Sequence, residues 1–93
     1  MKLVRAHVLI FGRVQGVFFR ANTLERAIDI GLRGWVRNVH TGEVEAVFEG
    51  DEEKVKEMIE WCRKGPPSSR VDDVKVTFEK YKGEFEGFER RQF

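Results

Sequence analysis

The chain has 93 residues, which suits a single domain over 1–93 with one hydrophobic core. Hydrophobic residues make up 41% and aromatic residues 12%, as in globular proteins, and no apolar run approaches the roughly 20 residues of a membrane helix. Seventeen Lys and Arg residues against sixteen Asp and Glu residues give a formal net charge of +1. We therefore expect no general attraction to nucleic acid or to an anionic membrane, and any anion site must be local.

The single cysteine, Cys62, cannot form an internal disulfide, and His7 and His40 are the only histidines. No clustered metal ligands follow from these residues, so we expect neither a metal nor a cofactor. The sequence starts without the apolar core of an export signal, which favours a cytoplasmic location. Charged residues reach 35%, above the roughly 25% of ordinary domains, a bias typical of thermostable proteins.

Hydrophobic periodicity predicts six main elements and a short tail strand. Residues 4–11 predict a strand with one strongly apolar face, which carries Val4, Ala6, Val8 and Ile10, and one mixed face. A helix follows Phe19, with Leu24, Ala27, Ile28 and Leu32 at helical spacing. Alternation then predicts a hairpin over 35–39 and 43–49, a helix over 51–65, a strand over 74–79 and an edge strand over 88–93.

The order strand, helix, strand, strand, helix, strand is that of the α+β split βαβ, or ferredoxin-like, sandwich. It predicts an antiparallel sheet with two helices packed on one face. Charged residues at 89–91 on the predicted edge strand discourage pairing with another chain, so we expect a monomer.

The stretch from residue 10 to residue 20 reads as a strand end, a loop bracketed by Gly12 and Gly16, and a helix start. Glycines let the backbone turn several N–H groups toward one point, and the N-terminus of the helix adds its free N–H groups. Arg20 follows in the first helical turn, where a cation opposes the helix dipole. A guanidinium can hold two oxygens of one phosphoryl group, so the loop and Arg20 together predict a cradle for a small dianion.

Several other residues have plainer interpretations. Asn38 is unusual inside a strand and can be an early turn residue. Phe18, Phe19 and Trp35 are expected in the core or as supports of the loop rather than as platforms for a ligand. Cys62 lies on the apolar stripe of the second helix and is expected to be a core residue.

Two motifs resemble the signatures of the acylphosphatases: residues 12–20, GRVQGVFFR, and residues 34–38, GWVRN, followed by Gly42, Glu43, Val44 and Gly50. The resemblance covers nearly the whole chain and implies the ferredoxin-like fold. It also implies hydrolysis of the carboxyl-phosphate bond of acyl phosphates to a carboxylate and inorganic phosphate, without metal or cofactor. Phosphate or sulfate should then compete with the substrate.

By the same resemblance, Arg20 binds the substrate phosphate and Asn38 orients the attacking water. The phosphate-binding loop comprises Gln15, Gly16, Val17, Phe18, Phe19 and Arg20. The alternative is a non-catalytic ferredoxin-like module that binds RNA, protein or a small anion, because many functions share this fold. Residues 33–36 have a superficial likeness to part of an RNA-recognition motif, but the other exposed aromatic residues of that motif are absent and the net charge is small.

Overall fold

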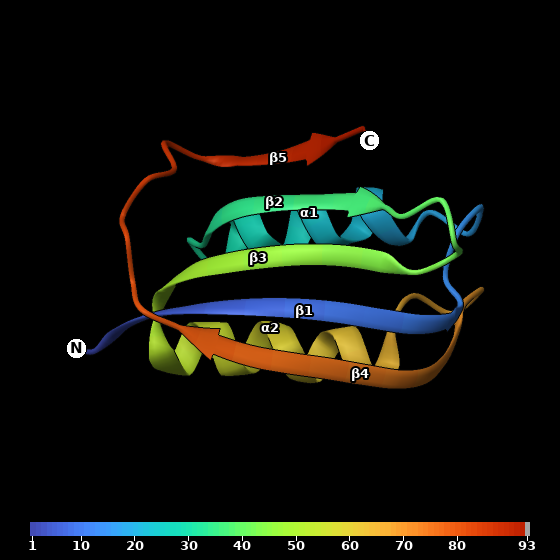
Figure 1. Cartoon of the computed structure of the whole chain (residues 1–93), viewed down its shortest axis with the longest axis horizontal. Helices are drawn as coiled ribbons and strands as arrows, with labels where there is room; N and C mark the ends of the chain where they lie inside the picture. The colour runs from blue at the N-terminus through green and yellow to red at the C-terminus, as the bar shows by residue number, and fades with distance from the viewer. Residues whose placement is uncertain (93) are drawn as a thin grey trace.

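The computed structural model describes residues 1–92, and the elements follow one another in the predicted order. They are β1 (Leu3–Arg13), α1 (Phe19–Asp29), β2 (Arg33–Asn38), β3 (Val44–Asp51), α2 (Glu52–Lys64), β4 (Arg70–Glu79) and β5 (Phe88–Arg91). The strands form one sheet in the order β4-β1-β3-β2-β5, and both helices lie behind the same face of it (Figure 1). The predicted α+β split βαβ arrangement is confirmed.

The prediction of an antiparallel sheet is correct for four strands and wrong for the fifth. β4, β1, β3 and β2 pair antiparallel, but β5 pairs parallel to β2. The chain leaves the end of β4 and crosses to the opposite edge of the sheet, where it enters β5 at the end from which β2 also starts (Figure 1). The crossover, rather than a hairpin, therefore sets the direction of β5. Phe93, the last residue of the predicted edge strand, lies outside the described residues.

The core lies between the sheet and the helices, as alternation in the first strand predicts. The apolar face of β1 is buried, and α1 turns Phe19, Thr23 and Ala27 toward it at a spacing of four residues. Of the predicted stripe residues, Ala27 and Leu32 are buried, but Ile28 is 56% exposed, so its assignment to the buried face is wrong. Thr23 fits the buried face because its hydroxyl donates to the Phe19 carbonyl at 2.8 Å.

α2 covers the other half of the sheet with a buried stripe of Val55, Met58, Ile59 and Cys62. Burial raises the pKa of the Cys62 thiol to about 12. The thiol therefore stays protonated and unreactive at neutral pH. The prediction that Cys62 is a core residue is confirmed.

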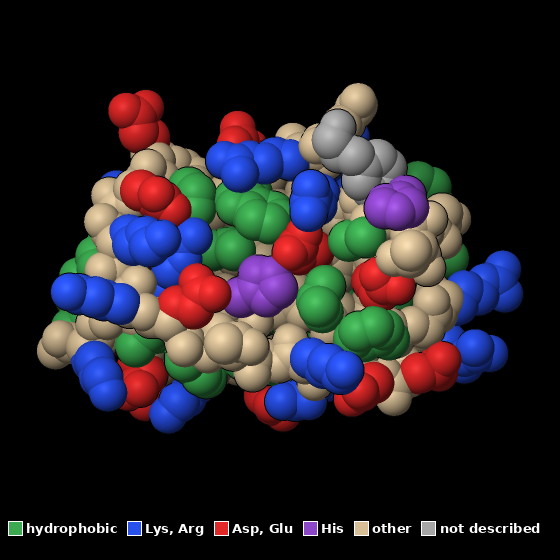
Figure 2. Space-filling model, viewed as in Figure 1, with side chains coloured by type: hydrophobic (Ala, Val, Ile, Leu, Met, Phe, Trp, Pro, Cys, Tyr) green, Lys and Arg blue, Asp and Glu red, His purple; other side chains and the backbone are tan. Residues whose placement is uncertain are grey.

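The uncovered face of the sheet carries acidic and basic side chains close together among hydrophobic ones (Figure 2). Near its centre the Glu45 carboxylate contacts His7 Nε2 and Arg37 Nε, each at 2.6 Å. Burial disfavours the charged form of Glu45, but the hydrogen bonds from His7 and Arg37 outweigh it and lower the pKa of Glu45. Charges on this face thus largely neutralise one another.

Arg5 and Glu49 are the buried members of a second charge cluster on this face. Its guanidinium contacts Glu49 at 3.1 Å, Glu79 at 3.0 Å and Glu84 at 2.7 Å. Glu49 Oε2 also accepts hydrogen bonds from the backbone N–H groups of Lys82 at 2.9 Å and Gly83 at 3.3 Å. The cluster therefore attaches the start of the crossover segment to the centre of the sheet.

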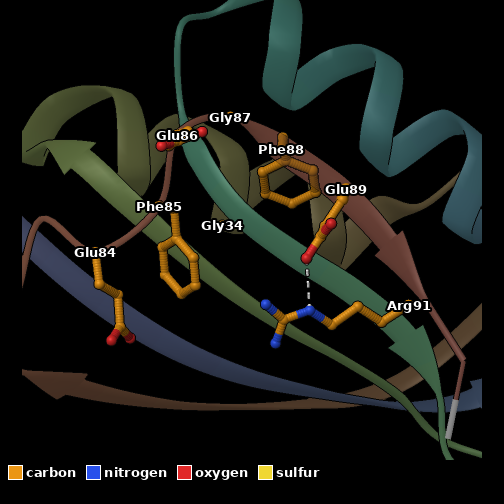
Figure 3. Close-up of a pocket in the computed structure, with 8 residues that line it drawn as sticks. All are labelled: Gly34, Glu84, Phe85, Glu86, Gly87, Phe88, Glu89 and Arg91. Atoms are coloured by element: carbon orange, nitrogen blue, oxygen red, sulfur yellow. Dashed lines mark hydrogen bonds and ion pairs between the residues drawn. The ribbon is translucent and has the colours of Figure 1, made fainter.

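The rest of the crossover lies along the edge of β2 (Figure 3). The Arg91 guanidinium lies 5.9 Å from the centre of the Phe85 ring, and Arg91 Nε donates to Glu89 at 2.8 Å. On the opposite face of the sheet, the Phe88 ring stacks on Phe48 with ring centres 5.6 Å apart. β5 is thus held from both faces, although it has only four residues.

We expect Arg5→Ala to lower the free energy of unfolding by about 3–5 kcal/mol, because it leaves the buried Glu49 carboxylate without its cation. Urea denaturation gives the value. Arg70→Ala is the matched control, since Arg70 pairs with Asp72 where both side chains are more than half exposed. That change should cost less than about 1 kcal/mol. Equal losses in the two variants would contradict a special role for the buried cluster.

Candidate active site

The loop between β1 and α1 begins two residues later than the glycine pattern predicts, because β1 extends to Arg13. Gly12 belongs to β1, at an irregularity in its pairing with β4, and has a φ of +130°. A Cβ at Gly12 would lie 2.2 Å from the backbone oxygen of Arg70, so only glycine fits there. Gly12 thus permits the close approach of β1 and β4. The spacing of Gly12 and Gly16 predicts that Gly12 forms one side of the cradle, and the structure instead places it in the strand.

The turn of the loop comes from two other residues with left-handed backbone conformations. Gly16 has a φ of +72°, and Phe18 has a φ of 63° and a ψ of 22°. Phe18 is the one residue other than glycine with positive φ among residues 1–92. Successive turns of this kind bring neighbouring N–H groups toward one point, as in anion-binding nests.

Side chains tie the loop to the rest of the fold on two sides. The Gln15 side-chain amide donates to the backbone oxygens of Val39 at 2.6 Å and Glu43 at 2.9 Å, both in the turn between β2 and β3. The Ser68 hydroxyl donates to the Val17 carbonyl at 3.2 Å. The loop is therefore held in position by the neighbouring connections of the sheet.

Arg20 lies in the first turn of α1, as predicted. The first turn contains no acidic residue, and no side chain caps its N–H groups. Within residues 1–92, the Arg20 side chain forms no ion pair and no hydrogen bond. An uncompensated guanidinium therefore stands beside the positive end of a helix dipole, which favours a bound anion.

Asn38 is the last residue of β2 and lies on the helix side of the sheet. Its Oδ1 is buried and is the one buried side-chain N or O atom in the described part of the chain without a hydrogen-bond partner. Such atoms are rare because a lost hydrogen bond costs about 1–3 kcal/mol. A buried acceptor beside a pocket is well suited to hold a water molecule or a substrate group.

One pocket of about 280 Å³ brings most of the predicted site residues together. Its lining includes Gly16, Phe18, Phe19, Arg20 and Asn38 from the prediction. The side chain of Gln15 instead binds the β2–β3 turn, and Val17 is 7% exposed and belongs to the core. The three lining residues that the sequence did not predict are Val14, Ala21 and Arg90.

The comparisons with known proteins agree with this geometry. A family model for acylphosphatase matches residues 6–90. The chain is 61% identical over 85 residues to the acylphosphatase of Syntrophobacter fumaroxidans, a match that covers 91% of this chain and 88% of that protein. It is 57% identical over 90 residues to the acylphosphatase of Aeropyrum pernix, covering 96% and 89%. This chain belongs to the acylphosphatase family.

Solved structures of acylphosphatases also share the fold. The enzyme from Bacillus subtilis superposes with a TM-score of 0.91 at 33% identity, covering 95% of this chain and 98% of that one. The enzyme from Coxiella burnetii gives a TM-score of 0.91 at 34% identity, covering 96% and 93%. The predicted class of enzyme, an acyl phosphate hydrolase, is confirmed, and the comparisons give no support to a non-catalytic binding module.

Proposed function

We propose that the pocket at the start of α1 is the active site in which this acylphosphatase hydrolyses acyl phosphates. Arg20 and the backbone N–H groups of residues 15–19 bind the phosphoryl group, and Asn38 positions the attacking water. The observation that carries this proposal is that one pocket is lined by both Arg20, whose guanidinium is unpaired, and Asn38, whose buried amide oxygen is unpaired. The buried oxygen is costly without a partner, and the guanidinium opposes the helix dipole; phosphate and water would satisfy both.

The chemistry requires little beyond positioning. Water forms a new O–P bond while the P–O bond to the acyl group breaks, and the electron pair leaves on a carboxylate. Because a carboxylate is a weak base, its departure needs no strong general acid. In a loose phosphoryl-transfer transition state the nucleophile carries little charge, so an oriented water is sufficient. Arg20 and the loop amides stabilise the charge on the phosphoryl oxygens.

No metal or other cofactor enters this proposal. The residues that line the pocket include no carboxylate, imidazole or thiol, so they offer a divalent ion none of its usual side-chain anchors. Inorganic phosphate and sulfate present the same tetrahedral oxygens as the substrate. Both should therefore compete with acyl phosphates for the loop and Arg20.

The activity can be tested with purified protein, acetyl phosphate and benzoyl phosphate in a buffer that contains EDTA. We expect release of inorganic phosphate well above the buffer rate, and inhibition by added phosphate. Activity that disappears on chelation and returns with magnesium or zinc would contradict the metal-independent mechanism. Protein that hydrolyses neither compound would overturn the proposed function.

The roles of the two side chains predict different defects. Arg20→Ala should lose about 2–5 kcal/mol of interaction with the phosphoryl group and so weaken both phosphate binding and turnover, and Arg20→Lys should restore little because an ammonium lacks the planar fork. Asn38→Ala should lower kcat about a hundredfold and leave KM and phosphate affinity nearly unchanged. Calorimetric titration with phosphate, together with steady-state kinetics, separates the two defects.

Arg13→Ala is the matched control for the loss of a cation near the loop, because Arg13 is exposed at the end of β1 and does not line the pocket. It should leave kcat and phosphate affinity within about twofold of the parent values. Unchanged phosphate affinity in Arg20→Ala would contradict the role of Arg20. A near-parental kcat in Asn38→Ala would contradict that of Asn38.

We further propose that the enzyme is a thermostable monomer of the cytoplasm. The ion pairs of Arg5 and Glu45 lose less to desolvation as temperature rises, and the exposed face of β5 carries charges that discourage edge pairing. No helix within residues 1–92 is long and apolar enough to cross a membrane.

Sedimentation should give one mass near 10.9 kDa. Thermal unfolding should show a midpoint above the roughly 45–65 °C of mesophile domains.

A further inference from the structure

Phe18 is the least expected residue of the pocket. The sequence predicts a core position or a support of the loop, and because Phe18 is 77% exposed, the core position is wrong. Its left-handed backbone conformation costs a residue with a Cβ roughly 1–2 kcal/mol. A large ring in solvent and an unfavourable φ are two separate costs at one position, which points to function rather than to packing.

The conformation of Phe18 is fixed by its neighbours. Val17 before it and Phe19 after it are both buried, at 7% and 1% exposure. The Phe18 carbonyl accepts hydrogen bonds from the backbone N–H of Asn22 at 3.1 Å and from its side-chain amide at 2.8 Å. Both flanking side chains belong to the core, whereas Phe18 is exposed and lines the pocket.

The pocket is larger than the phosphoryl group requires. A phosphate has five heavy atoms, and at the roughly 30 Å³ that each water occupies in the liquid it needs at most about 150 Å³. The pocket holds about 280 Å³, so space remains beside the phosphoryl group for part of the acyl group. In-line displacement places the attacking water and the acyl group on opposite sides of phosphorus. Water held by Asn38, at the end of β2, therefore directs the acyl group away from β2, and Phe18 lies on the wall formed by the loop.

We propose that the Phe18 ring contacts the acyl group of the bound substrate and makes the enzyme prefer apolar and aromatic acyl phosphates. This inference rests on the proposed function, because it assigns the acyl side of the same site. Ring-to-ring contact and the removal of apolar surface from water favour a benzoyl group over an acetyl group. The side chain of Phe18 then sets specificity, while its backbone N–H remains one of the proposed phosphate-binding amides of the loop.

Kinetics of benzoyl phosphate and acetyl phosphate test the preference. The ratio of kcat/KM for the two substrates should fall about threefold to tenfold in Phe18→Ala. Phe18→Asn should give the same fall, and because asparagine tolerates the left-handed conformation it keeps the loop geometry. Phe78→Ala is the matched control, since Phe78 is 52% exposed on β4, outside the pocket, and its loss should leave the ratio unchanged.

Binding without turnover gives a second, independent measurement. Benzylphosphonate and methylphosphonate keep the anionic group and differ in the attached group, so calorimetry on each reports the contribution of the ring. The parent protein should bind benzylphosphonate more tightly, and Phe18→Asn should lose that advantage while it retains affinity for methylphosphonate.

The outcomes separate this inference from the proposed function. A parent protein that hydrolyses neither acyl phosphate overturns the function, while the phosphonate titrations still report on Phe18. An active parent whose substrate ratio and phosphonate preference are both unchanged in Phe18→Asn overturns the role of Phe18 alone. That role is also overturned if Phe18→Asn lowers kcat/KM for both substrates and the affinity for both phosphonates by one common factor, because Phe18 would then only shape the loop.

Discussion

The two hydrogen bonds donated by the Gln15 amide connect the two halves of the site. One half is the loop before α1, and the other is the end of β2 with Asn38, more than twenty residues later in the sequence. The amide of Gln15 reaches across to Val39 and Glu43, which form the turn that ends β2 and starts β3. An anion cradle is useful only if it is already formed before the anion binds. Gln15 therefore ties the loop that we propose to bind phosphate to the end of β2, where Asn38 is proposed to hold the water.

Charge compensation is distributed unevenly in this fold, and the site benefits from that distribution. On the uncovered face, Arg5, Arg37 and Arg91 each contact at least one carboxylate. In the pocket, Arg20 has no acidic partner among residues 1–92. A chain with a net charge of only +1 can thus present a local positive potential, because Arg20 and Arg90 line the pocket and no Asp or Glu of the described residues does. Net charge predicts the absence of a general nucleic-acid surface and gives no information about such a local site.

The sequence predicts the parts of this structure that depend on local periodicity. Alternation in β1, the apolar stripe of α2 and the position of Arg20 in the first helical turn all follow from residues close together in the chain. The parallel direction of β5 and the presence of Arg90 in the pocket depend on a crossover between opposite sheet edges, and no local pattern records it. The requirement for glycine at position 12 is equally invisible in the local sequence, because it comes from the backbone of Arg70 on a neighbouring strand.

Phe18 and Asn38 show why local rules fail most clearly at the site itself. A phenylalanine predicts burial, and a buried amide oxygen predicts a partner, yet the structure satisfies neither expectation. Each departure costs roughly 1–3 kcal/mol, a noticeable share of the 5–15 kcal/mol by which small domains are stable. The fold can sustain these costs because a continuous core of β1, α1 and α2 side chains surrounds the loop on its inner side. The core holds the exposed ring and the unpaired oxygen in place, so the site that we propose for the substrate and its water needs little rearrangement on binding.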